Sequence, residues 1–245
     1  MDNNEFRHWS VKAAEWGVDY RTGLRDRPVR PDVKPGSIFG AVAASAPEQA
    51  EPMEDIFADF EATIVPGMTH WQHPRFFAYF PANAAPVSVV AEYLVSAMAA
   101  QCMLWQTGII NYSEWSVPLG RRFRALKLWF LLRAHGLEGL RTMIRNHVAW
   151  SEKLAERLRR EPGFEISSEP MLSLFSFRHV PGAAADLDQH NLDLVERINR
   201  DGRIYLTQTR LDGRAVIRFQ AGQFEATEAD VDHAFEVITE IARAG

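Results

Sequence analysis

Apolar residues recur at steps of three and four along two early stretches of the chain. The first stretch runs from Glu5 to Tyr20 and carries large side chains at Phe6, Trp9, Ala13, Trp16 and Tyr20. The second opens at Pro52, ends at Pro66-Gly67, and carries Met53, Ile56, Phe57, Phe60 and Ile64. Each spacing places its side chains on one face of a helix.

The two predicted helices are separated by a segment that cannot itself be helical. Prolines at positions 28, 31 and 35 predict an extended connector from Arg27 to Gly36. Two apolar-faced helices joined in this way form little core, so we expect them to pack on another domain or subunit.

The segment from Thr69 to Pro86 is rich in aromatic residues, histidine, asparagine and proline, and has too little periodicity for a helix. We predict an ordered loop. Such loops often carry functional residues, but aromatic loops also cover hydrophobic cores, and both interpretations remain open on the residues alone.

The second half of the chain predicts a small sheet covered by helices. The expected helices are Gly120 to His135, Gly136 to Arg160, Asp186 to Asn199 and one opened by a Thr227/Asp230 capping pair. The expected strands are Phe164 to Ser167, Leu172 to His179, Arg203 to Thr209 and Ala215 to Gln220, with a turn at Asp212-Gly213. Together they indicate an α+β unit from about residue 140 to the end.

Composition and charge exclude some classes of function. The chain has 245 residues, of which 47% are hydrophobic and 24% charged, enough for one or two globular domains. A formal charge of -5 leaves no basic footprint for nucleic acid. Cys102 is the single cysteine, and the polar N-terminus lacks the features of a secretory signal, so we expect a cytoplasmic protein. The apolar stretch from Val87 to Leu104 is interrupted by polar residues, which favours a buried or subunit-facing helix over a membrane span.

Few residues suggest chemistry by spacing. His70 and His73 lack a third metal ligand nearby, so we expect no metal site. Arg121, Arg122 and Arg124 could bind a phosphate or carboxylate, or could be solvated helix residues. The four lysines are Lys12, Lys34, Lys127 and Lys153, and each is expected at the surface rather than in a cofactor pocket.

Two longer motifs carry a family resemblance. The segment His73-Pro74-Arg75-Phe76-Phe77-Ala78-Tyr79-Phe80-Pro81 resembles a signature of the group II pyridoxal-phosphate-dependent amino-acid decarboxylases, the aromatic-L-amino-acid decarboxylases among them. The segment from Val117 to Phe130 (VPLGRRFRALKLWF) resembles the start of the C-terminal part of the same enzymes. The two motifs occur in the family's order, and the resemblance covers nearly the whole chain.

The resemblance also implies a missing part. In the family a large domain lies between the equivalents of about Thr107 and Ile110, and it carries the Schiff-base lysine and the aspartate that faces the pyridine nitrogen. Without these groups the cofactor is not anchored as an electron sink. We therefore expect a remnant of the fold type I, aspartate-aminotransferase-like architecture that does not bind pyridoxal phosphate alone and is inactive alone. The expected organisation is an N-terminal helical dimerisation arm with the substrate-rim loop (1–107), a junction where the family's large domain is absent (108–116), and C-terminal helices with a small α+β domain (117–245).

The resemblance further implies which residues line the substrate and which partners to expect. The expected lining residues are Tyr79, Phe80, Ala82, Met103 and Arg121. The expected partners are a second copy of the chain and, in the family, an aromatic L-amino acid. Two alternatives remain: a non-enzymatic dimerisation or interaction module, and a complete decarboxylase in which Gly108 and Ile109 are not consecutive.

Overall fold

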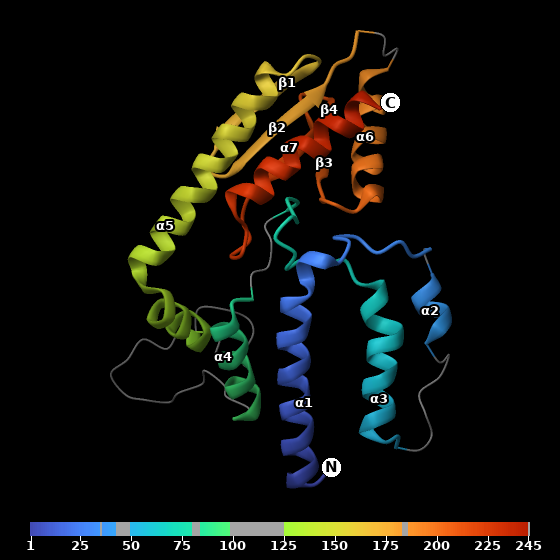
Figure 1. Ribbon diagram of the computed structural model, residues 1–245, viewed down its shortest axis with the longest axis vertical. Helices are drawn as coiled ribbons and strands as arrows, with labels where there is room; N and C mark the ends of the chain where they lie inside the picture. Colours follow the sequence, from blue (N-terminus) through green and yellow to red (C-terminus); the bar gives the residue numbers. More distant parts are fainter. Residues whose placement is uncertain (35, 43–49, 80–83, 99–124, 183–185, 245) are drawn as a thin grey trace, which may run out of the picture. The chain divides into compact units, whose positions relative to one another are not determined.

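The computed structural model describes all residues except 35, 43–49, 80–83, 99–124, 183–185 and 245 (Figure 1). The chain divides into two compact units, one formed by residues 1–82 with 147–245 and the other by residues 83–146. No helix in the described part of the chain is long and apolar enough to cross a membrane.

The N-terminal arm contains the two helices that the sequence predicts. Helix α1 (Asn3–Thr22) begins with a capping box between Asp2 and Glu5. Helix α3 (Met53–Asp59) continues without a break through the π-helical turn η2 (Phe60–Ile64) and the 3-10 turn η3 (Val65–Gly67). Two short elements, η1 (Leu24–Asp26) and α2 (Ser37–Ala41), were not predicted from the sequence. The rings of Trp9 on α1 and Phe57 on α3 lie 5.5 Å apart. The helices therefore pair through their aromatic faces, although no residue of α1 or α3 is fully buried.

The proline-rich connector contains no helix or strand among its described residues, and it is fixed to the C-terminal part at Val29. The backbone N–H of Val29 donates to the carbonyl oxygen of Gly202 at 2.9 Å, and that of His70 donates to the Val29 carbonyl at 2.9 Å. The Val29 side chain is completely buried. The connector thus runs between the C-terminal part and the aromatic segment rather than through solvent.

The unit of residues 83–146 contains α4 (Pro86–Ala97) and the first part of α5 (Ala125–Arg160). Helix α5 breaks at Gly136, whose φ of 66° and ψ of 163° are not helical. This break is where the sequence predicts a boundary between two helices, whereas the predicted start at Gly120 lies outside the described residues.

The C-terminal part is an antiparallel four-stranded sheet with the strand order β1-β2-β4-β3. Its elements are β1 (Phe164–Met171), β2 (Leu174–His179), α6 (Leu187–Asp201), β3 (Thr207–Leu211), β4 (Arg214–Gln220) and α7 (Glu228–Arg243). The predicted α+β unit, the Thr227/Asp230 capping box and the Asp212-Gly213 turn, with φ values of 51° and 80°, are confirmed.

The third predicted strand is placed too early. We predicted Arg203 to Thr209, but β3 begins at Thr207. The side chain of Asn199 accepts from the N–H of Leu206 at 2.8 Å and donates to its carbonyl oxygen at 3.0 Å. These bonds occupy the N–H and the carbonyl oxygen of Leu206, which a strand would use for pairing. The strand therefore begins at the next residue, Thr207.

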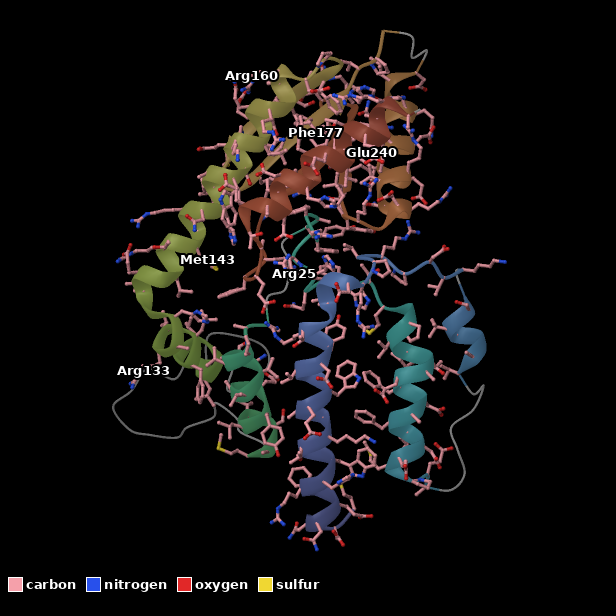
Figure 2. All side chains as sticks on the ribbon, viewed as in Figure 1. Arg25, Arg133, Met143, Arg160, Phe177 and Glu240 are labelled. Atoms are coloured by element: carbon pink, nitrogen blue, oxygen red, sulfur yellow. The ribbon has the colours of Figure 1, made fainter. Side chains whose placement is uncertain are left out.

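The main core lies between the sheet and the helices α5, α6 and α7. Phe175, Phe177 and Phe219 project from the two central strands and are completely buried. Figure 2 labels Phe177 among the side chains of this core. Leu158 of α5 and Ile238 of α7 belong to the same cluster. The residues that give these elements their apolar faces therefore meet in one place.

The turn between β1 and β2 contains an unfavourable backbone conformation. Leu172 has a φ of 53° and its side chain is 74% exposed. Because a left-handed conformation is costly for a residue with a Cβ, we expect Leu172→Gly to raise the free energy of unfolding by about 0.5–1 kcal/mol. Urea denaturation measures this change. Met171→Gly, in the adjacent strand, is the control and should destabilise; equal losses in both variants would contradict the prediction.

Candidate functional site

The aromatic loop, which we define as residues 69–79, pairs with the edge of the C-terminal sheet. The N–H of Phe77 donates to the Tyr205 carbonyl at 3.0 Å, and the N–H of Tyr205 donates to the Arg75 carbonyl at 3.2 Å. The N–H of Gln220 donates to the Phe77 carbonyl at 3.1 Å. The loop therefore behaves as a short additional strand beside the start of β3 and the end of β4.

The loop covers core with some of its residues and leaves two aromatic side chains exposed. Phe76, Phe77 and Ala78 are buried and cover core, whereas Trp71 and Tyr79 are 43% and 48% exposed. Since buried and exposed residues alternate within a few positions, the buried ones hold the exposed ones in place.

Four aromatic rings of the loop and its neighbour form a continuous stack. The ring centroids of Tyr79 and Trp71 are 5.5 Å apart with an interplanar angle of 9°. Trp71 continues to Phe76 at 4.9 Å, and Phe76 to Tyr205 at 5.4 Å. The stack is buried at Phe76 and open to solvent at Tyr79 and Trp71, so its open end offers flat apolar faces and edges to another planar group.

Tyr79 adopts an unfavourable backbone conformation in the stack. Its φ is 53°, in the left-handed region that bulky residues rarely adopt. Backbone strain of this kind persists only where the surrounding structure imposes it, and it concentrates at functional sites. We therefore take the Tyr79 end of the stack as the candidate site.

Side chains from distant elements hold the first part of the loop. The hydroxyl of Tyr20, on α1, lies 2.8 Å from Nδ1 of His70. Burial lowers the pKa of His70 and raises that of Tyr20, which favours the neutral forms of both. Nε2 of Gln223, in the segment after β4, donates to the Trp71 carbonyl.

His73 lies in the centre of the loop and is almost completely buried, with 1% of its surface exposed. Its Nδ1 accepts from the N–H of Arg75 at 3.0 Å, so the proton of the neutral ring sits on Nε2. Nε2 has no partner among the described residues. Burial, followed by the nearby Arg75, lowers the pKa of His73 to about 4, so the ring is neutral at physiological pH.

Only one of the predicted lining residues can be placed. Tyr79 is at the open end of the stack, while Phe80, Ala82, Met103 and Arg121 lie outside the described residues. The sequence analysis missed Trp71, which precedes the quoted motif by two positions and could have been suspected from its aromatic character. It also missed Gln223, for which no sequence signal exists because its contact spans 152 positions.

Comparison with known proteins assigns the chain to a family. The conserved domain of pyridoxal-dependent decarboxylases matches residues 35–110 and 106–180, which is more than half of the chain. The chain belongs to the pyridoxal-dependent decarboxylase family. The resemblance to the group II aromatic amino-acid decarboxylases is thereby confirmed.

Individual decarboxylase relatives match only in part. The aromatic-L-amino-acid decarboxylase of Rattus norvegicus is 40% identical over 134 residues, covering 55% of this chain and 27% of the relative. The phenylacetaldehyde synthase of Arabidopsis thaliana is 35% identical over 136 residues, covering 55% of this chain and 28% of the relative. The match thus spans about a quarter of the length of these curated relatives.

A solved structure shows the same fold. The crystal structure of Oryza sativa TDC with PLP superposes with a TM-score of 0.93 at 17% sequence identity, covering 100% of this chain and 98% of that chain. At this level of identity the likeness concerns the fold and not the reaction.

The decarboxylase family uses pyridoxal phosphate, but the lysines of this chain do not fit that cofactor. Nζ of Lys12 lies 4.6 Å from the Trp9 ring centroid, and Lys34 is exposed. Nζ of Lys153 is 2.7 Å from Glu228, whose hydrogen bond is the main cause of a raised Lys153 pKa. A Schiff-base lysine needs the opposite shift, toward the neutral amine.

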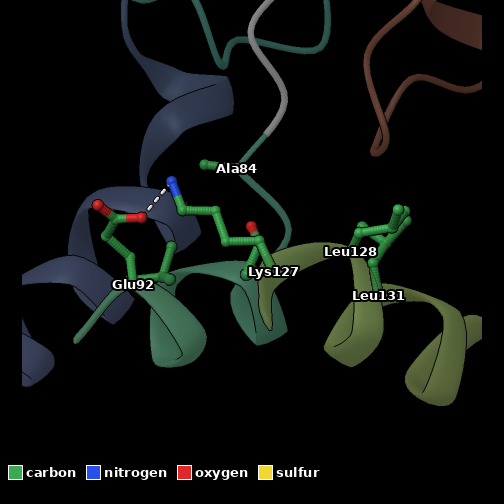
Figure 3. Close-up of a pocket in the computed structure, with 7 residues that line it drawn as sticks. Ala84, Glu92, Lys127, Leu128 and Leu131 are labelled. Carbon is green, nitrogen blue, oxygen red and sulfur yellow. Dashed lines mark ion pairs between the residues drawn. The ribbon is translucent and has the colours of Figure 1, made fainter. Parts of the chain in front are cut away.

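Lys127 is the lysine that comes nearest to a cofactor environment. It lines a cavity of about 400 Å³ together with Ala84, Ser88, Val89, Glu92, Leu128 and Leu131. Its ammonium forms an ion pair with Glu92, as Figure 3 shows. Glu92 is the sole carboxylate among the lining residues, and it faces the lysine, so it cannot also serve a pyridine nitrogen. No step through the cofactor can therefore be assigned to these residues.

Metal binding finds no support in the described part of the chain, where no group of three histidine, cysteine or carboxylate side chains could hold an ion. Nδ1 of His70 is engaged with Tyr20, and Nδ1 of His73 with the backbone of Arg75. The arginine cluster at positions 121, 122 and 124 lies outside the described residues.

Proposed function

We propose that this chain is an aromatic-amino-acid carboxy-lyase polypeptide that carries the substrate rim but not the cofactor site, and does not decarboxylate alone. The observation that carries the proposal is the environment of its lysines. Four lysines occur in the sequence, and each is exposed, paired with a carboxylate or placed against an aromatic face.

Several findings support the division of the chain that this proposal requires. The conserved-domain match comes in two pieces that overlap at residues 106–110, which agrees with a junction near Thr107 to Ile110. The proposed parts are therefore the arm and rim (1–107), the junction (108–116) and the C-terminal part (117–245). The antiparallel sheet of the last part corresponds, in this proposal, to the small domain of fold type I.

The substrate class follows from the rim. The names of the relatives describe decarboxylation of aromatic L-amino acids and synthesis of phenylacetaldehyde. The open end of the Tyr79–Trp71 stack suits a planar side chain of that kind. We propose that Tyr79 lines the substrate together with Phe80, Ala82, Met103 and Arg121.

The experiment combines the mass of the purified protein with cofactor trapping. A protein with an intact mass of 27.8 kDa is incubated with pyridoxal phosphate and borohydride, and adducts are located by peptide mass spectrometry. Release of carbon dioxide from carboxyl-labelled L-tyrosine and L-tryptophan is measured in parallel. We expect at most scattered surface adducts and no release of carbon dioxide above that of free pyridoxal phosphate.

The controls separate this outcome from the alternatives. Lys127→Arg keeps the ion pair with Glu92 and removes a lysine that lines an apolar cavity together with a carboxylate. Turnover by a protein of this mass, abolished by Lys127→Arg, would contradict the proposal. A substantially heavier mass would instead support the complete-enzyme alternative.

A second candidate function, an interaction module that dimerises, is favoured by the surface of α4. This helix has one charged residue, Glu92, yet several of its large apolar side chains are exposed. Val89, Val90 and Leu94, for example, are 52%, 54% and 38% exposed. A helix that is apolar on all sides normally lies buried. If this face joins two copies, Val90→Lys should shift the protein from dimer to monomer in sedimentation equilibrium. Met171→Lys on β1, at a position that is 77% exposed, should not.

A further inference from the structure

The connection between β4 and α7 (residues 221–227) and the first turn of α7 each touch the aromatic loop at one point. Nε2 of Gln223 donates to the Trp71 carbonyl, and Gln223 is 2% exposed. The carboxylate of Asp230 accepts from Nε of Arg75 at 3.4 Å and is 3% exposed. One contact lies at each side of the buried His73, so the two fix the loop before and after its centre.

Asp230 is held in place by more than the loop. Its oxygens accept from Nη1 and Nη2 of Arg25 at 2.7 Å and 3.2 Å, and from the N–H of Thr227 at 2.9 Å. Burial alone would raise the pKa of Asp230, but the hydrogen bonds from Arg25 and Thr227 outweigh it and the pKa is lowered. Two arginines thus reach one carboxylate from different places, Arg25 from the 3-10 turn η1 that follows α1 (Figure 2) and Arg75 from the loop.

We propose that Gln223 and Asp230 are positioning residues for the substrate rim, because they fix Trp71 and Arg75 and thereby impose the stacked place of Tyr79. The proposal rests on the proposed function, in which Tyr79 lines the substrate. Its physical basis is the strained backbone of Tyr79, which needs outside contacts to persist. The loop's pairing with the sheet edge fixes the backbone of residues 75–77, and the bond to Asp230 fixes the side chain of Arg75. Trp71, the ring that Tyr79 stacks on, is fixed through Gln223.

The test measures whether the Tyr79 ring is stacked. The five tyrosines are labelled with 3-fluorotyrosine, and the ¹⁹F resonance of Tyr79 is assigned by its loss in Tyr79→Phe. Trp71→Ala supplies the resonance position of an unstacked Tyr79. We expect Gln223→Met and Arg75→Met to move the Tyr79 resonance most of the way to that position.

Arg25→Met is the matched control, because it removes a contact to the same carboxylate from outside the loop. It should lower the urea midpoint and leave the Tyr79 resonance in place. The proposal is overturned if the resonance stays unchanged in both loop-contact variants, or moves as far in Arg25→Met. Should Gln223→Met not fold, Arg75→Met decides alone, since the Arg75 side chain is 28% exposed and its loss is tolerable.

A titration with L-tryptophan separates this inference from the proposed function. In the unaltered protein, L-tryptophan should shift the Tyr79 resonance saturably, and the two loop-contact variants should bind about five- to tenfold more weakly, as expected for the loss of one hydrogen bond. If the unaltered protein does not respond while the variants still lose the stack, the positioning stands and the substrate-lining role fails. If it responds and the variants bind equally well, the positioning fails and the lining role stands.

Discussion

Replacing Phe177 by alanine is expected to lower the free energy of unfolding by about 3–5 kcal/mol. Phe177 is completely buried, and its ring lies 6.0 Å from that of Phe175 and 6.1 Å from that of Phe164. The substitution removes a large apolar side chain from the centre of a sheet, where the backbone cannot move in to fill the cavity. Urea denaturation followed by circular dichroism measures the loss.

Two further variants serve as controls for the expected loss of stability. Phe177→Leu, which leaves a smaller cavity, should lose clearly less stability than Phe177→Ala. Met171→Ala, at a position that is 77% exposed, should stay within about 0.5 kcal/mol of the unaltered protein. A loss below about 1 kcal/mol for Phe177→Ala would mean that Phe177 does not lie in a close-packed core.

The protein is expected to lose about 3 kcal/mol of stability between about pH 6.5 and pH 4 through His73. The pKa of His73 is about 4 in the folded protein, against 6.5 for the ordinary side chain. Within this interval the unfolded chain binds a proton at His73 and the folded chain does not. Stability from this residue is therefore complete above the unfolded pKa and is lost as the pH falls toward the folded one.

The contribution of His73 can be isolated by substitution. In His73→Asn the amide oxygen can still accept from the N–H of Arg75, but the residue does not titrate. We expect the variant to show a shallower fall in unfolding free energy between about pH 7 and pH 4.5. His8→Asn, at an exposed position, controls for the loss of a histidine as such. Parallel pH profiles for His73→Asn and the unaltered protein would show that His73 is accessible to protons in the folded state.

Elements whose ends depend on neighbouring residues were predictable. The capping box of Thr227 and Asp230, the Asp212-Gly213 turn and the break at Gly136 were all located from local patterns. Local chemistry is sufficient here because a cap or a turn is formed by residues within four positions of each other.

The start of β3 and the pairing of the aromatic loop with Tyr205 were not predictable in this way. Tyr205 has strand-forming neighbours in the sequence. In the structure, however, Tyr205 pairs with Phe76 of the aromatic loop, and the backbone of Leu206 bonds to the Asn199 side chain. The strand propensity of a residue does not include its partners on other elements, and these partners decide where the strand begins.

By itself, the sequence determined the family motifs, the amphipathic helices, the α+β character of the C-terminal part and the shortage of lysines suited to a cofactor. The tertiary structure alone decided that Trp71 stacks on Tyr79 and that Gln223 and Asp230 reach the loop across more than 150 positions. The physical reason is that motifs and periodicities express interactions between near neighbours. Stacking, burial and long-range hydrogen bonds arise only when the folded backbone brings distant residues together.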